Sequence, residues 1–265
     1  MNVSYLTNNY TLSSFYSTIT KVDFHFMDYS EVILKIKNSI AVVIDVNPTN
    51  PSLSGKGSGF IFQKKGILVT CNHVISSGSA KLKFPDSKPN EYIDAAVVLR
   101  DVEHDLALLK FDDTKREPLK IGDINFIKEG MPVIFSGYPF SLTNLTTHHG
   151  ILSAIITDPS GIINYLIDGS VNSGNSGCPL MTENGEVIGI VNATRREYVE
   201  VLNKVENMKH GAISLYHLDL VRIFKALSGN LQLGIGYAIP CSYIPEHHEL
   251  DVEDNDTNKT TNHEL

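Results

Sequence analysis

Short runs of apolar and β-branched residues, separated by turn residues, recur along most of the chain. Gly, Pro, Asn and Asp occupy the turns, and Glu-Asn-Gly at residues 183–185 is a good hairpin signal. Many short strands with few helices predict an all-β barrel or sandwich. Strand-like runs lie at residues 40–46, 59–63, 67–70, 80–84, 95–99, 106–111, 131–137, 150–157, 162–167, 187–192 and 236–239.

Helical spacing of apolar positions occurs in three segments, residues 29–37, 197–208 and 217–227. The last two interrupt a region of strands, so we expect residues 195–233 to form a helical insertion. The stretch after residue 245 is polar and acidic, a composition typical of disorder. The sequence therefore predicts an N-terminal extension with a short helix over residues 1–39, a folded domain over 40–245 and a disordered tail over 246–265.

Composition narrows the classes of function. Hydrophobic residues make up 42% of the 265 residues, enough for a sizeable core, and the net charge of −8 repels phosphate backbones, so we expect no nucleic-acid partner. The three cysteines are too few for a secreted disulfide framework. Residues 1–14 lack the features of a signal peptide, and no apolar run is long enough to span a bilayer. These features predict a cytoplasmic protein without a membrane partner.

Three local motifs carry candidate chemistry. His73 closes an apolar strand, Asp105 opens another, and Ser176 lies in a glycine-flanked loop where backbone amides can converge. Taken alone, the histidine is more often a core residue and the aspartate more often a turn residue, while the serine loop is an ordinary tight turn about as often as a functional one. Their joint occurrence in a fixed order is the informative signal.

Four segments together resemble the trypsin-like serine peptidases, and most closely their Deg/HtrA-like branch. The resemblance implies two six-stranded antiparallel β-barrels of the chymotrypsin fold, with His73, Asp105 and Ser176 as the catalytic triad of a serine endopeptidase. The substrate would be a polypeptide, and no cofactor or metal is expected. The segments are Gly-Ser-Gly-Phe at 57–60, Thr-Cys-Asn-His-Val at 70–74, Asp-Leu-Ala-Leu-Leu-Lys at 105–110 and Gly-Asn-Ser-Gly at 174–177.

The same resemblance implies further site residues. Ser170 matches the base of the primary specificity pocket, where an Asp would select Lys or Arg, so we expect a preference for small or medium apolar side chains. The backbone amides of the serine loop would form an oxyanion hole, and the next segment an edge strand for substrate pairing. The residues implied are Gly174, Asn175 and Ser176 for the hole and Asn192, Ala193 and Thr194 for the strand.

Departures from the family pattern leave several points open. Cys178 replaces a glycine after the serine, and with Cys71 we expect it to be a small packing residue rather than part of a redox switch. Asn175 stands where an activating ion pair would need an Asp, so activity is expected to depend on loop ordering. A PDZ domain is not expected. The insertion at residues 195–233 either gates the cleft, docks a protein activator or is a surface ornament.

Two other functions compete with that of a peptidase. An α/β-hydrolase would need a glycine two residues after the nucleophile, where Cys178 stands, and a base that follows the serine in the chain. That alternative is weak. The second alternative is a trypsin-fold binding or scaffold module with little or no activity. The presence of Gly174 and of all three triad residues favours the enzyme.

Overall fold

The computed structural model describes residues 28–46, 56–113, 115–193, 205, 208–228 and 235–245. The predicted extension up to residue 27, the predicted acidic tail and nearly all of the predicted helix at 197–208 lie outside these described residues. The division of the chain into an extension, a domain and a tail therefore stays a prediction.

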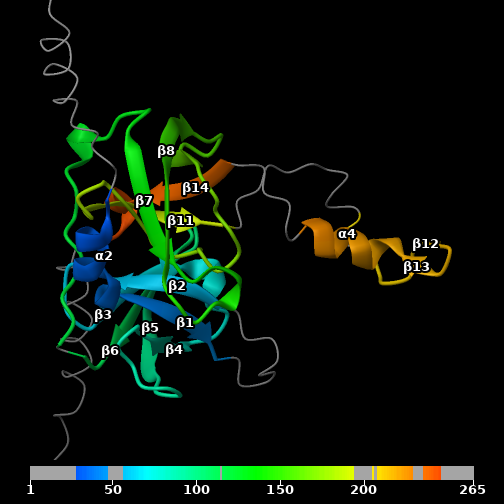
Figure 1. The fold of residues 1–265 in the computed structure, drawn as a ribbon, viewed down its shortest axis with the longest axis horizontal. Helices are drawn as coiled ribbons and strands as arrows, with labels where there is room; N and C mark the ends of the chain where they lie inside the picture. The colour runs from blue at the N-terminus through cyan, green and yellow to red at the C-terminus, as the bar shows by residue number, and fades with distance from the viewer. Residues whose placement is uncertain are drawn as a thin grey trace, which may run out of the picture.

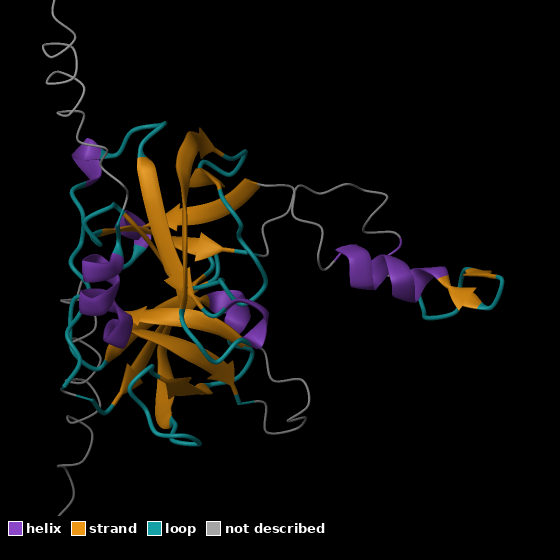
Figure 2. Cartoon of the chain, in the orientation of Figure 1, coloured by secondary structure: helices purple, strands orange, loops and turns teal. Residues whose placement is uncertain are grey.

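The first half of the described chain forms a closed antiparallel barrel, in the lower part of Figures 1 and 2. The strand β1 lies between its barrel neighbours and β7 of the second barrel, so nearly all of its side chains are buried. This explains why its sequence is a continuous run of apolar residues rather than an alternating one. The strands, in order around the barrel, are β1 (Ile40–Asp45), β2 (Lys56–Ile61), β3 (Ile67–Cys71), β6 (Leu106–Phe111), β5 (Ile93–Asp101) and β4 (Ser79–Lys83), which pairs back onto β1.

The second half forms another closed barrel of six antiparallel strands. The prediction of two six-stranded antiparallel barrels is therefore confirmed. The strands, in order, are β10 (Pro179–Met181), β11 (Val187–Asn192), β14 (Ile235–Pro240), β9 (Ile163–Asp168), β8 (Thr146–Thr157) and β7 (Pro132–Gly137), which pairs back onto β10.

One apolar core runs through the first barrel and across the junction between the two. Phe60 and Leu68 of the first barrel belong to the same buried cluster as Ile134, Tyr138 and Ile190 of the second. Burial of apolar surface thus holds the barrels together as well as closing each one. Short 3-10 turns mark the loops around this core, namely η1 (Lys37–Ser39), η3 (Asn72–Val74), η4 (Ile124–Phe126), η5 (Pro139–Ser141) and η6 (Cys241–Tyr243).

Two α-helices of the described part of the chain lie outside the barrels. The predicted helix at 29–37 is α2 (Ser30–Ile36), and it packs on the β10–β11 hairpin, where a Cβ on Gly185 would be 2.8 Å from Val32. The second, α4 (Leu220–Ser228), begins three residues later than predicted, because β12 (Ser214–Leu215) and β13 (Leu218–Asp219) pair as a hairpin before it. Figure 1 shows this hairpin and α4 to one side, away from both barrels.

Within the described residues, no helix combines the length and apolar character that a membrane span requires.

Asp45, at the end of β1, is a buried carboxylate with a set of hydroxyl and amide donors. It is 2% exposed, and it accepts hydrogen bonds from Ser76 Oγ, from Ser77 N at 3.2 Å and from Ser77 Oγ at 2.7 Å. Burial alone would raise its pKa, but these hydrogen bonds outweigh burial and hold the pKa below its ordinary value. Asp45 therefore favours the folded state while it is ionised.

We expect Asp45→Asn to lower the free energy of unfolding by about 1–3 kcal/mol near pH 7. The folded-state pKa lies below the unfolded one, so the contribution is complete above about pH 4 and is lost as pH falls through the folded-state pKa. The difference between variant and wild type should therefore shrink toward about pH 3 in urea unfolding. Asp94→Asn, whose side chain is 85% exposed, is the control. An equal difference at both pH values would contradict this assignment.

Candidate active site

His73 and Asp105 meet at the edge of the first barrel, as the motif order implied. His73 lies on η3, directly after β3, and its Nδ1 is 2.6 Å from Asp105 Oδ2. Its backbone N–H also donates to Asp105 Oδ1 at 2.9 Å. Asp105 precedes β6 and has a φ of 56°, in the left-handed region. One carboxylate thus fixes both the ring and the backbone of the histidine.

A residue of the second barrel also donates a hydrogen bond to the carboxylate of Asp105. Asn192, at the end of β11, donates its side-chain N–H to Asp105 Oδ2 at 2.8 Å. Because the carboxylate is an acceptor only, His73 Nδ1 carries the proton of the neutral ring, and Nε2 keeps its lone pair. Asn192 was predicted to lie in the strand whose backbone pairs with substrate, and its side chain also bonds to Asp105 within this site.

Ser176 lies in the loop between β9 and β10 and is 4% exposed. Its Oγ accepts a hydrogen bond from the backbone N–H of Ala193 at 3.2 Å. Gly177 N–H in turn donates to Val191 O at 2.8 Å. The end of β11 therefore ties down the serine loop at residues 191 and 193, while Asn192 between them binds the carboxylate of Asp105.

Contacts to the first barrel bring the serine loop toward His73. The carbonyl of Ser176 accepts a hydrogen bond from Ser58 N–H at 2.8 Å. A Cβ added to Gly57 would be 3.0 Å from that carbonyl and 2.7 Å from Val74, the residue after His73. The three predicted catalytic residues are thus gathered at the junction of the two barrels.

The backbone of the serine loop presents free donors. Gly174 and Ser176 are buried, and their amides have no acceptor among the residues that the structure describes. Gly174 has a φ of 96°, and a Cβ there would be 2.4 Å from Tyr138 O, so the position requires glycine. The amide of Asn175, predicted as a third donor, already donates to Asn172 O at 2.9 Å. Two donors remain for an oxyanion.

Ser58 is a site residue that sequence reasoning did not single out. It is fully buried, its Oγ donates to Gly174 O at 2.7 Å, and the same Oγ accepts from Tyr138 N–H at 2.9 Å. Its carbonyl accepts from Thr70 Oγ1 at 2.7 Å. The available signal was a hydroxyl between two glycines at the start of an otherwise apolar strand.

The other residues predicted to bind substrate are Ser170, Ala193 and Thr194. Ser170 is exposed, and its carbonyl accepts from Asn172 Nδ2 at 3.4 Å. Ala193 is half-buried, and its amide is engaged by Ser176. Thr194 lies outside the described residues, as do residues 195–204, 206–207 and 229–233 of the predicted insertion.

The cysteines are buried thiols. Burial raises the pKa of Cys71 well above its usual value, with the charge of Asp105 adding to the effect, and burial likewise raises the pKa of Cys178. Ligand atoms of Cys71, His73 and Asp105 lie within 4.8 Å of one another. A metal would need the thiolate of Cys71, whereas this thiol donates to Val191 O at 3.4 Å. The environment suits packing residues rather than metal ligands or redox-active thiolates.

A second histidine–carboxylate pair supports the turn that carries Asp105. His104 Nδ1 is 2.6 Å from Asp101 Oδ2, and the His104 ring stacks on Tyr243 with centroids 4.0 Å apart. Burial would raise the pKa of Asp101, but hydrogen bonds from His104 outweigh it and lower the pKa. Tyr243 Oη accepts from Ile163 N–H of the second barrel, so this pair also links the two barrels.

The family model described as a trypsin-like peptidase domain matches residues 57–190. A probable periplasmic serine endoprotease, DegP-like, from Brucella suis is 40% identical over 141 residues, which are 51% of this chain and 27% of that protein. Protease Do-like 5, chloroplastic, from Arabidopsis thaliana is 32% identical over 183 residues, which are 63% of this chain and 56% of that protein.

Among solved structures, an HtrA-type protease, AlgW with tripeptide, superposes with a TM-score of 0.62 at 24% identity, covering 86% of this chain and 64% of that one. The likeness in structure supports the fold, and the sequence matches confirm the resemblance to Deg/HtrA-like proteins. The chain spans about a quarter of the length of the DegP-like relatives it matches.

We expect Ser58→Ala to lower the free energy of unfolding by about 1–3 kcal/mol, because it leaves Gly174 O and Tyr138 N–H without their buried partner. Urea unfolding measures the loss. Ser153→Ala, an exposed serine with only a 3.5 Å contact to Ile151 O, is the matched control and should change stability little. Equal stability of the two variants would show that the Ser58 hydroxyl does not hold the loop.

Proposed function

The chain belongs to the trypsin-like peptidase family, and we propose that it is a serine endopeptidase in which His73, Asp105 and Ser176 act as the catalytic triad. The observation that carries the proposal is the hydrogen bond from His73 Nδ1 to Asp105 Oδ2. It leaves Nε2 as the basic nitrogen of the ring, at the junction where the serine loop enters. A polypeptide is the proposed substrate.

In this mechanism Ser176 Oγ attacks the carbonyl carbon of the scissile peptide bond while His73 Nε2 takes the hydroxyl proton. Asp105 holds the ring in the required tautomer and stabilises its charged form. The tetrahedral intermediate expels the amine, which receives the proton from His73, and an acyl-enzyme remains on Ser176. Water, deprotonated by the same imidazole, then hydrolyses the ester and restores the serine.

The oxyanion of that intermediate would be bound by the amides of Gly174 and Ser176. Unpaired N–H groups in a buried loop are costly and rare, so two of them beside the nucleophile favour a ligand that binds during the reaction. Removing one such donor from a peptidase typically lowers turnover by about 10²–10³. Asn175 is left out of the hole because its amide is already bonded to Asn172 O.

Asn192 is proposed as a positioning residue through its side chain, in addition to its predicted place in the strand whose backbone pairs with substrate. Its side chain reaches Asp105 from β11, across the junction between the barrels, and so couples the position of the carboxylate to the strand that binds Ser176. Ala193 and Thr194 remain the proposed strand edge for substrate pairing. Regulation by loop ordering, or by a protein activator at residues 195–233, also remains a proposal.

A cytoplasmic location stays a prediction from the sequence. The relatives carry names that place them in the periplasm or the chloroplast. Fractionation of the native host with compartment markers is the direct measurement.

We expect a fluorophosphonate probe to label the wild-type chain and Ser173→Ala, but not Ser176→Ala, because only the hydroxyl activated by His73 should react. Ser173 is an exposed serine in the same loop and serves as the control. Labelling that persists in Ser176→Ala would move the nucleophile elsewhere. A wild-type chain that takes no label would instead favour the inactive binding module.

Cleavage of a peptide library is expected to show small or medium apolar residues before the scissile bond, since Ser170 offers no charge to a basic side chain. The variant Ser170→Asp should shift the preference toward Lys and Arg by adding a carboxylate at that point. A wild-type preference for Lys or Arg, or no shift in the variant, would remove Ser170 from the pocket.

A further inference from the structure

The hairpin and helix beside the barrels form an exposed apolar tip. We call the described residues 208–228 the arm. Leu215, Tyr216 and Leu218 at the end of its hairpin are 54%, 89% and 57% exposed. Large apolar side chains gathered in this way on a protein surface are typical of an interaction surface.

The turn at the tip has a strained backbone, and its first residue is the exposed Tyr216. Tyr216 and His217 join β12 to β13 and have φ values of 48° and 66°. A two-residue hairpin loop with both residues in this region normally uses Asn and Gly, because bulky side chains there strain the backbone. Such strain is typical of positions kept for function.

The arm is also basic, although the whole chain is acidic. It carries Lys209, Arg222 and Lys225 against a single carboxylate, Asp219, while the net charge of the chain is −8. Lys209 and Arg222 are exposed. The arm therefore offers an apolar tip with positive charge behind it.

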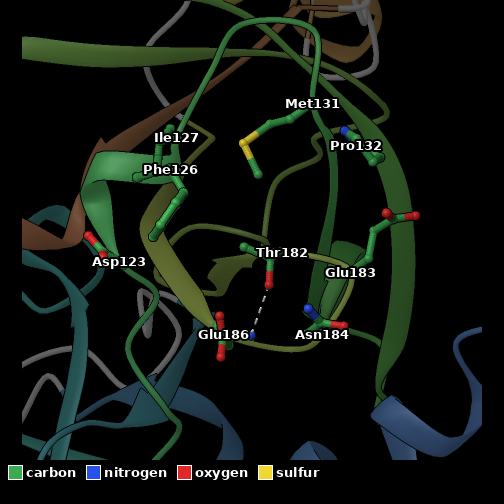
Figure 3. A pocket seen from close by; sticks show the side chains of 9 residues that line it. All are labelled: Asp123, Phe126, Ile127, Met131, Pro132, Thr182, Glu183, Asn184 and Glu186. Carbon is green, nitrogen blue, oxygen red and sulfur yellow. Dashed lines mark hydrogen bonds between the residues drawn. The ribbon is translucent and has the colours of Figure 1, made fainter.

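A cavity with the complementary chemistry lies on the second barrel (Figure 3). We call it the η4 pocket, and its volume is about 340 Å³, within the range of ligand pockets. Phe126, beside it, is 74% exposed, and Figure 3 shows the thioether of Met131 directed into it. Its apolar and acidic lining includes Phe126, Ile127, Met131, Asp123, Glu183 and Glu186.

The carboxylates of the pocket outnumber the cations bonded to them. Glu186 pairs with Lys120, and Glu183 accepts only the neutral Tyr29 hydroxyl, at 3.0 Å, among the described residues. Asp123 binds the amide and side chain of Asn125. The pocket thus combines an apolar interior with unbalanced negative charge at its rim, as a basic, aromatic-tipped partner requires.

The two features lie on opposite sides of the molecule. The β10–β11 hairpin that lines the pocket packs on α2, through Gly185 and Val32, and Figure 1 shows α2 and the arm at opposite sides of the barrels. In this arrangement the arm lies away from the pocket of its own chain (Figure 1). Two different surfaces in contact give head-to-tail association.

From these observations we propose that the arm of one chain docks into the η4 pocket of a second copy, with Tyr216 seated against the apolar lining and the arm's cations facing Asp123, Glu183 and Glu186. The occupant is a second copy because the chain itself supplies both halves of the complementary pair. The proposal is independent of peptidase activity.

Sedimentation velocity over a concentration series tests the association. The wild-type chain is expected to give masses above that of one chain, falling on dilution. Tyr216→Gly should weaken association about tenfold or more, since it removes the central aromatic contact while glycine relieves the left-handed turn. Phe126→Ser should do the same from the pocket side. Val102→Ser, 75% exposed on the first barrel, is the matched control and should associate as wild type does.

A mixing experiment gives the sharper result. Head-to-tail docking predicts that Tyr216→Gly and Phe126→Ser chains, each a single chain alone, form one-to-one pairs when mixed, because one intact arm and one intact pocket remain. Circular dichroism establishes that both variants are folded. The proposal is overturned by a wild-type chain that stays single at all concentrations, by association that neither variant weakens, or by a mixture that does not pair.

Discussion

A buried hydroxyl, that of Ser58, joins the loop of Ser176 to the opposite barrel. Its hydrogen bonds to Gly174 O and from Tyr138 N–H are made in a region without solvent, where a lost partner leaves a desolvated polar group. The proposed nucleophile, Ser176, belongs to the second barrel, and its proposed base, His73, belongs to the first. Their relative position therefore depends on polar bonds across the junction, for which the shared apolar core supplies the dry surroundings.

The site keeps polar groups unpaired where the fold would be more stable without them. The amides of Gly174 and Ser176 lack acceptors among the described residues, and the fully buried side chain of Asn175 has neither amide atom bonded. Proteins usually satisfy such groups, and exceptions concentrate at functional sites. The burial of the neighbouring strands β10 and β11, which are almost wholly buried, offsets the free-energy cost of these unpaired polar groups. Stability in the barrels thus permits incomplete bonding in the loop.

Much of this architecture was predictable because strand periodicity and turn chemistry are local properties. The limits of β6 and β11 match their predicted ranges, whereas β10 was missed, since three residues beginning with a proline give no periodic signal. The hairpin at 214–219 was missed because its turn uses Tyr and His instead of the usual Asn-Gly. Motif order brought His73 and Asp105 together correctly. The roles of Ser58 and Asn192 depend on contacts 116 and 87 residues away in the chain, which no local pattern reveals.

The left-handed backbone at Asp105 limits which residues can ever stand there. Among residues with side chains, only asparagine and aspartate adopt this conformation readily, because their short polar groups bond to nearby backbone. Replacement by glutamate would keep the carboxylate but strain the left-handed backbone. Replacement by alanine would strain the backbone and also remove the charge. Only replacement by asparagine would remove the charge of the carboxylate without straining the left-handed backbone. The torsion angle at this position therefore restricts the tolerated side chains independently of the chemistry that the carboxylate supplies.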